Sequence, residues 1–162
     1  MIKVGDPIPE CELRLIDEKG IRKINTNDFI NKTIIIVGVP GAFTPTCHND
    51  HIPKFAKKSE EIKNDYNIDE IYCIANNDPH VMEAWRNSFI NTKLKFLSDG
   101  NSDFLRRSGL AKDCKSSFMG ERLKRFIFII KDNILENLLI DETGLLNTSF
   151  ENMLDILSKD IH

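Results

Sequence analysis

Cys47 is the residue whose type and position favour chemistry most directly. It follows segment 33–39, Thr-Ile-Ile-Ile-Val-Gly-Val, which is the clearest buried strand of the chain, and a loop that begins at Pro40. Thr44 and Pro45 favour the start of a helix, because threonine is a good N-cap and proline suits the first helical position. With Thr44 as the N-cap, Cys47 is the third helical residue, where unpaired amides and the helix dipole favour a negatively charged sulfur. The sequence therefore predicts a thiolate nucleophile at this strand-to-helix junction.

A thiolate here needs more stabilisation than the helix provides. A free thiol has a pKa of about 8.5, so a sulfur that is mostly ionised at neutral pH requires about 3–4 kcal/mol. The helix terminus provides ~1 kcal/mol, and a nearby cation must provide the rest. Arg122, Lys124 and Arg125 are the candidates. Arg125 is the most interesting because it opens the apolar run 126–130, whose strand would fix its backbone; the alternative is a surface arginine at a strand end.

Several other candidate residues each have two interpretations. His51 follows it by four residues, so a regular helix would present both on one face. His51 could orient the active loop, or it could be a partly exposed helix histidine. The two residues would also suit a shared zinc ion, but no companion cysteine pair follows at zinc-finger spacing. Phe43, Phe118 and Met119 could keep water from the sulfur, or they could belong to an ordinary core.

The composition is that of an ordinary globular chain. Its 162 residues fit a single domain, 1–162, whose core needs no disulfide or metal. The net charge of −3 gives no basic excess for nucleic acid or an anionic membrane, and the longest apolar runs are far too short to cross a bilayer. The four cysteines include no Cys-x-x-Cys pair and suit free thiols in a reducing compartment. We expect a cytoplasmic protein, since the start shows no targeting pattern, although a removed organellar transit peptide would leave no trace.

Alternating strand and helix patterns predict a layered α/β fold. A hairpin is expected at the N-terminus around Gly20, and a second one across Asp132-Asn133. Pro53 lies inside the helix that follows Thr44 and predicts a kink there. The order of elements predicts a central mixed β-sheet, flanked by helices, with its site at the carboxyl ends of the strands. The expected strands are 11–16, 21–24, 33–39, 68–75, 94–97, 125–131 and 134–140, and the expected later helices begin near 78, 101 and 149.

Residues 37–47, read with His51 and Pro53, resemble the active-site segment of the peroxiredoxins and match the type-5 subfamily best. The segment reads Val-Gly-Val-Pro-Gly-Ala-Phe-Thr-Pro-Thr-Cys and contains the Pro-x-x-x-Thr-x-x-Cys pattern of the family. The similarity covers essentially the whole chain and continues at 3–6, 76–78, 85, 97–99, 123–126 and 143–145. It implies a thioredoxin-like fold with an N-terminal β-hairpin extension.

The resemblance also implies an activity and a set of roles. The protein would be a thiol-dependent peroxidase that reduces hydrogen peroxide, organic hydroperoxides or peroxynitrite in antioxidant defence and redox homeostasis. Cys47 would be the peroxidatic cysteine and form a sulfenic acid. Thr44 would hydrogen-bond the sulfur and the peroxide, Arg125 would hold both, and Pro40, which precedes Gly41 in the loop, would shield the sulfur. No metal, haem or flavin would be required.

The regeneration of the thiol is where the sequence departs from the type-5 pattern. Some members carry a resolving cysteine shortly after the Thr-Gly-Leu segment, but here 143–149 contains no cysteine and none follows. We therefore expect a one-cysteine cycle with an external thiol, either glutathione with or without glutaredoxin or, as the alternative, thioredoxin. Cys73 is expected in the core, Cys11 looks incidental, and Cys114 is expected to be exposed and is the best internal alternative.

Three further expectations complete the sequence-based picture. Type-5 members commonly form homodimers, and Phe43, Trp85 and segment 114–119 could contribute to such an interface. A redox sensor that passes its oxidation to a partner protein stays open as a second function. A binding module of the same fold without activity is the third.

Overall fold

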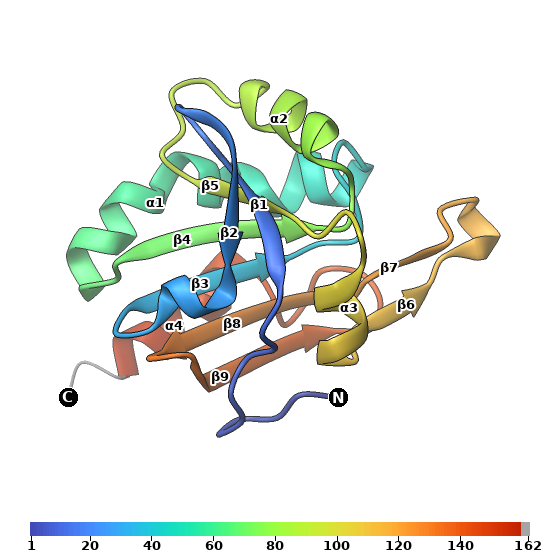
Figure 1. Cartoon of the computed structure of the whole chain (residues 1–162). Helices are drawn as coiled ribbons and strands as arrows, with labels where there is room; N and C mark the ends of the chain where they lie inside the picture. The colour runs from blue at the N-terminus through green and yellow to red at the C-terminus, as the bar shows by residue number, and fades with distance from the viewer. Residues whose placement is uncertain (160–162) are drawn as a thin grey trace.

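A seven-stranded mixed sheet forms the centre of the computed structural model, which describes residues 1–159 (Figure 1). The strand order is β2-β1-β5-β4-β3-β8-β9. β3, β4 and β5 run parallel, and antiparallel hairpins extend the sheet on both sides. The predicted fold is thus confirmed, including the N-terminal hairpin. The strands are β1 (Glu12–Asp17), β2 (Gly20–Asn25), β3 (Thr33–Gly38), β4 (Glu70–Ala75), β5 (Lys95–Ser98), β8 (Arg125–Lys131) and β9 (Ile134–Asp141).

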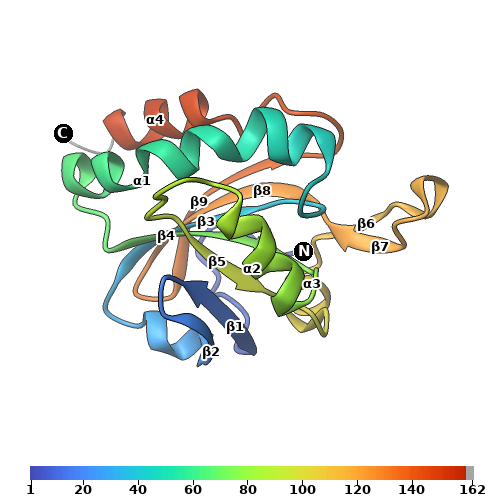
Figure 2. The same ribbon diagram turned by 90° about the horizontal axis from the view of Figure 1, so that it is seen from above.

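Helices cover both faces of this sheet. α1 (Ile52–Tyr66), α2 (Pro79–Asn87) and α4 (Phe150–Lys159) pack on one face, and α3 (Asp103–Ser108) packs on the other with the N-terminal segment. Figure 2 shows α1 and α4 side by side, where the rings of Phe55 and Phe150 meet edge to face at 5.3 Å. Among residues 1–159, no helix combines the length and the apolar character needed to cross a membrane.

β3 lies inside the sheet, between β4 and β8, and its side chains are apolar on both faces. Ile35 and Val37 face the α1 side and Ile36 faces the α3 side, and all three are fully buried. Buried parallel strands favour such continuous β-branched runs. β3 ends at Gly38, where a β-carbon would lie only 1.9 Å from the Phe126 ring of β8. The close packing of this ring therefore requires glycine where the chain leaves the sheet.

A second, smaller sheet is not predicted by the sequence. β6 (Ala111–Asp113) and β7 (Glu121–Leu123) form a separate two-stranded ribbon that projects from the body of the molecule (Figures 1 and 2). A short 3-10 turn, Lys115–Ser117, lies near its tip. These strands are only three residues long and mostly polar, so they show no hydrophobic periodicity that a sequence-based prediction could use.

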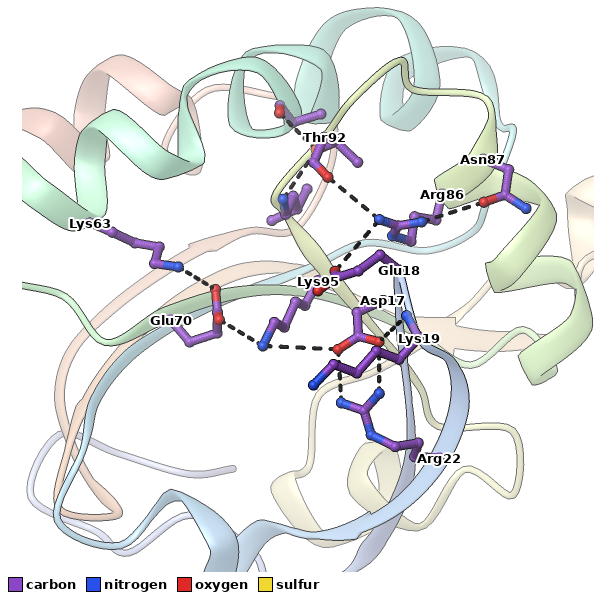
Figure 3. Close-up of polar contacts among 12 residues, drawn as sticks. Asp17, Glu18, Lys19, Arg22, Lys63, Glu70, Arg86, Asn87, Thr92 and Lys95 are labelled. Atoms are coloured by element: carbon purple, nitrogen blue, oxygen red, sulfur yellow. Dashed lines mark hydrogen bonds and ion pairs between the residues drawn. The ribbon is translucent and has the colours of Figure 1, made fainter.

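A polar network holds the end of the sheet where β4 and β5 begin (Figure 3). Both oxygens of Asp17, the last residue of β1, accept hydrogen bonds from Arg22 at 2.8 Å. Glu70 at the start of β4 pairs with Lys95 at 2.9 Å and with Lys63 of α1 at 3.3 Å. The hydrogen bond from Arg22 is the main cause that lowers the pKa of Asp17. This network fastens the N-terminal hairpin at the end of the sheet opposite the carboxyl ends of β3 and β4.

Candidate active site

The loop after β3 is tied to the neighbouring strand. The amide of Val39 donates to the carbonyl of Ile74 at 3.0 Å, so the loop begins at Pro40, beside the carboxyl end of β4. Asn77, just after β4, accepts a hydrogen bond from the amide of Ala42 at 2.9 Å. The loop therefore lies at the sheet edge where the carboxyl ends of parallel strands meet, as the sequence predicted.

The Thr44 side chain turns back into this loop. Its hydroxyl donates to the carbonyl of Gly41 at 2.8 Å, and its own carbonyl accepts the amide of His48 at 2.8 Å. The predicted side-chain N-cap is therefore wrong, because no side-chain cap is made at this helix start. A hydroxyl has one hydrogen and two lone pairs. With its hydrogen used on Gly41, the partly exposed Thr44 oxygen remains available as an acceptor.

A π-helical turn, Thr46–His51, carries Cys47 and leads into α1. The amide of Ile52 donates to the carbonyl of Cys47, five residues earlier. Pro53 lies in the first turn of α1, where helix amides lack partners in any case. The helix after Thr44 therefore changes from the π-helical turn to α1 directly before Pro53, and the kink expected at Pro53 stays a prediction. Cys47 still lies in the first turn, and no acidic residue shares that turn.

The side chain of Cys47 is fully buried in the apolar cluster between the sheet, α1 and α2. Cys73 of β4 belongs to the same cluster and is also fully buried, as expected. Burial raises the pKa of Cys73 well above its ordinary value; a negative charge on Cys47 would raise it further, whereas the charge of Arg125 lowers it. Cys47 and Arg125 thus lie within electrostatic range of the same buried position.

Arg125 enters the interior from β8 and is held there by His51. The two residues are 8% and 1% exposed. Nη1 of Arg125 donates to Nδ1 of His51 at 3.1 Å, and Nε2 of His51 donates to the carbonyl of Thr148 at 2.7 Å. Because a guanidinium has no acceptor, Nδ1 must be the acceptor and the neutral ring carries its proton on Nε2. His51 is therefore a buried residue that orients Arg125, not a partly exposed helix histidine.

The burial of His51 also keeps its ring neutral. Burial lowers the pKa of His51 to about 4; the carbonyl of Thr148 opposes this shift, and the charge of Arg125 adds to it. Both ring nitrogens already have hydrogen-bond partners. This arrangement does not fit a zinc ion shared between Cys47 and His51, since it leaves no nitrogen lone pair to bind one.

The other candidate cations have different partners. Lys124 pairs with Glu142 at 3.1 Å. Nε of Arg122 donates to the carbonyl of Met119 at 2.8 Å. Of the three candidates, only Arg125 is buried.

The predicted apolar shield is only partly present. Phe43 is 48% exposed, and its ring lies 5.4 Å from that of His48. Met119 is partly buried and packs against the active-site loop, since a β-carbon at Gly41 would lie 3.3 Å from its methyl group. Phe118 lies near the ribbon tip and is 99% exposed, so within one chain it does not keep water from Cys47 and that expectation is wrong.

One contact of the π-helical turn was missed. Nε1 of the fully buried Trp85 donates to Nδ1 of His48 at 2.9 Å, which fastens the turn to α2. A buried indole usually finds an acceptor, so Trp85 signalled that a partner must exist. Nothing in the sequence indicates that this partner lies 37 residues earlier.

Comparison with known proteins identifies the family of this chain. The Redoxin family model matches residues 3–148, and peroxiredoxin-2C of Arabidopsis thaliana is 38% identical over 88% of this chain and 89% of its own length. The chain belongs to the peroxiredoxin family. This protein is accordingly an enzyme, a thiol-dependent peroxidase, as the resemblance implied.

Solved structures support the same family. The Plasmodium falciparum antioxidant protein, a 1-Cys peroxiredoxin, is 32% identical with a TM-score of 0.89, covering 98% of this chain and 99% of its own. Peroxiredoxin 5 from Alvinella pompejana is 27% identical with a TM-score of 0.83, covering 98% and 99%. The expected thioredoxin-like fold is confirmed, and the type-5 resemblance is consistent with these relatives.

We expect the buried neutral His51 to make this peroxiredoxin sensitive to acid. Its pKa is about 4 in the fold, against 6.5 for an ordinary histidine. As pH falls through this interval, the unfolded chain binds a proton that the folded chain does not, so about 3 kcal/mol of stability is lost. His51→Gln is expected to flatten the decline in the free energy of unfolding over this interval, measured by denaturant titration.

The matched control is His80→Gln, on the exposed side of α2, which should leave the decline unchanged. Identical pH dependence in the His51→Gln variant and the original protein would show that His51 does not remain neutral inside the fold.

Proposed function

We propose that Cys47 is the peroxidatic cysteine and that it reduces hydroperoxides as a thiolate stabilised by Arg125. One observation carries the proposal. The side chain of Cys47 is fully buried in the first turn of a helix, and a buried guanidinium is fixed by His51 of the same turn. A cation placed in such surroundings stabilises a nearby anion far more than it would in water.

In the proposed step, the thiolate of Cys47 attacks the terminal oxygen of the hydroperoxide. The S–O bond forms as the O–O bond breaks, and the leaving hydroxide or alkoxide takes up a proton to become water or an alcohol. Cys47 is left as a sulfenic acid. Because sulfur supplies both electrons, the step requires no metal, haem or flavin.

Two residues are suited to stabilise the reacting atoms as negative charge moves from sulfur to oxygen. Beyond its bond to His51, Arg125 makes no side-chain hydrogen bond to residues 1–159, so its remaining donors are available to the sulfur and the peroxide. The oxygen of Thr44 can accept the peroxide hydrogen, because its own hydrogen is used on Gly41. Fixed groups of this kind act without reorganising during the reaction. Pro40 and Met119 border the same loop and would limit the access of water.

The proposed substrates are hydrogen peroxide, organic hydroperoxides and peroxynitrite, reduced in antioxidant defence and redox homeostasis. The half-exposed ring of Phe43 in the active-site loop would suit the apolar part of an organic hydroperoxide. We place the enzyme in the cytoplasm, since four free cysteines suit a reducing compartment.

The sulfenic acid is proposed to react with an external thiol. Burial raises the pKa of Cys11 to about 12 and that of Cys73 well above its ordinary value, so both would stay protonated and react poorly. A first glutathione would form a mixed disulfide with Cys47 and release water. A second thiol, from glutathione or glutaredoxin, would then release the Cys47 thiol and leave a disulfide of the reductant.

The ribbon beside the active-site loop favours glutathione over thioredoxin. Lys112 of β6 lies directly opposite Arg122 of β7, and like charges in such a pair repel. Neither residue forms an ion pair within the described part of the chain. Nη1 of Arg122 would lie 3.7 Å from a β-carbon at Gly41. The carboxylates of glutathione would relieve this repulsion close to the site.

A homodimer is the proposed assembly. Phe118 is 99% exposed near the tip of the projecting ribbon, and Phe43 is 48% exposed in the active-site loop. A large apolar side chain held at the end of a projecting ribbon is suited to insertion into a partner. A second copy would bury both rings and supply the shield that one chain lacks.

We expect one equivalent of hydrogen peroxide to add one oxygen to the reduced protein and glutathione to convert this product into an adduct. Intact-mass measurement follows both steps. Cys47→Ser is expected to abolish both the mass changes and the consumption of peroxide with glutathione. Loss of two hydrogens would contradict the one-cysteine cycle, and Cys73→Ser and Cys114→Ser would then identify the internal partner. Full peroxide consumption by Cys47→Ser would overturn the role of Cys47 itself.

Arg122→Gln is expected to raise the glutathione concentration for half-maximal turnover by about 10-fold, the effect of losing one charge-assisted hydrogen bond. Turnover with 2-mercaptoethanol, which has no carboxylate, should not change. Lys131→Gln, an exposed cation at the other end of β8, serves as the control. An equal effect of Arg122→Gln on both thiols, or no effect on either, would exclude carboxylate recognition at the ribbon.

Phe118→Ser is expected to convert a dimer into a monomer, because it removes the apolar contact of the ribbon. Light scattering coupled to size-exclusion chromatography measures the mass in solution. Ile90→Ser changes an equally accessible residue, 90% exposed after α2, and should leave the dimer intact. A dimer that persists in Phe118→Ser, or a monomeric original protein, would contradict the proposed interface.

A further inference from the structure

We infer that Asp141 positions Arg125 through Thr148 and His51, so that the loop after β9 sets the geometry of the peroxidase site. The inference rests on the proposed roles of Cys47 and Arg125. It assigns a function to a residue that lies outside the Cys47 segment and that no motif in the sequence singled out.

The carboxylate of Asp141 is the centre around which this loop folds. Asp141 ends β9 and is 3% exposed. It accepts hydrogen bonds from the amides of Leu146 at 3.0 Å, Asn147 at 2.8 Å and Thr148 at 2.9 Å, and from the hydroxyl of Thr148 at 2.8 Å. Burial alone would raise the pKa of Asp141, but these bonds outweigh it and the pKa is lowered. The carboxylate therefore stays charged, and the loop is closed around it.

Thr148 connects the closed loop to His51. Thr148 is fully buried and is held at both its amide and its hydroxyl, which leaves its carbonyl aimed at Nε2 of His51. That bond places the ring proton on Nε2, so Nδ1 is left as the acceptor for Arg125. A ring freed from Thr148 could rotate or move its proton to Nδ1, where it would face the guanidinium with a second donor.

Asp141 also avoids a contact that would oppose catalysis. It lies directly opposite Arg125 in the β8–β9 register, where a carboxylate ordinarily pairs with a guanidinium. The ion pairs of residues 1–159 nevertheless do not include this one. The four donors of the loop occupy the carboxylate instead, so the remaining donors of Arg125 stay available for sulfur and peroxide.

Asp141→Asn tests the inference with little change of shape. It removes the charge and replaces one acceptor oxygen with a donor, which loosens the loop. We expect the rate constant for reaction with hydrogen peroxide to fall about 10- to 100-fold, the effect of misplacing a catalytic group by a fraction of an ångström. The midpoint of the Cys47 thiolate titration, followed by ultraviolet absorbance, should rise. Thr148→Val removes only the hydroxyl donor and should produce smaller changes in the same direction.

Asp17→Asn is the matched control. Asp17 also ends its strand, is 5% exposed, has a lowered pKa and accepts several hydrogen bonds, but it lies at the other end of the sheet. It should lower the free energy of unfolding without changing the thiolate titration or the rate with peroxide. If Asp141→Asn shows only this loss of stability, Asp141 is merely structural and the inference is wrong. Should Asp141→Asn fail to fold, Thr148→Val decides by the same readouts.

A double-mutant comparison tests the route through His51. If Asp141 acts by way of the ring, Asp141→Asn in a His51→Ala background should slow the reaction no further than His51→Ala alone. Additive effects would overturn the relay. Failure of the proposed function looks different, because Cys47→Ser would then still reduce peroxide. Failure of the inference alone leaves Cys47 essential and Asp141→Asn without effect on the reaction.

Discussion

The guanidinium of Arg125 is buried in an apolar interior. The rest of the active-site region must provide partners for this charge. A buried charge is tolerated only where hydrogen bonds and opposite charges replace water. His51 provides one acceptor, and its own neutrality prevents repulsion between two cations. The sulfur of Cys47 is fully buried in the same interior. A thiolate at Cys47 would complete the neutralisation of the guanidinium. Both the fold and the proposed chemistry therefore favour a negatively charged sulfur at this position.

The two ends of the sheet use buried carboxylates for different purposes. At the end where β4 and β5 begin, Asp17 is paired with Arg22, and the charges neutralise each other in a network that fastens the N-terminal hairpin (Figure 3). At the other end, the carboxylate of Asp141 is occupied by backbone and hydroxyl donors instead. The difference matters because a guanidinium that is already paired with a carboxylate has fewer donors left for a substrate.

The loop after β9 connects the structure with the departure from the type-5 pattern. Some members of that subfamily carry a resolving cysteine there, whereas this loop has none and is closed around Asp141. A loop that must move to deliver an internal thiol has to give up its native contacts. A loop that keeps its contacts can instead support the arginine that we propose to act in the reaction. An external reductant and a fixed loop are therefore consistent with each other.

Local patterns in the sequence were sufficient for the strands of the central sheet, the two hairpins, the position of Cys47 at a strand-to-helix junction, and the resemblance to the peroxiredoxins. These depend on neighbouring residues: the β-branched run of β3, the Asp132-Asn133 turn, and the contiguous motif from Pro40 to Cys47. The direction of the Thr44 hydroxyl, the π-helical turn and the exposure of Phe118 were decided only by the tertiary structure. The partner of His51 lies 97 residues away and that of Arg125 lies 74 residues away. Such pairs depend on strand register and loop closure, for which a single sequence has no local signal.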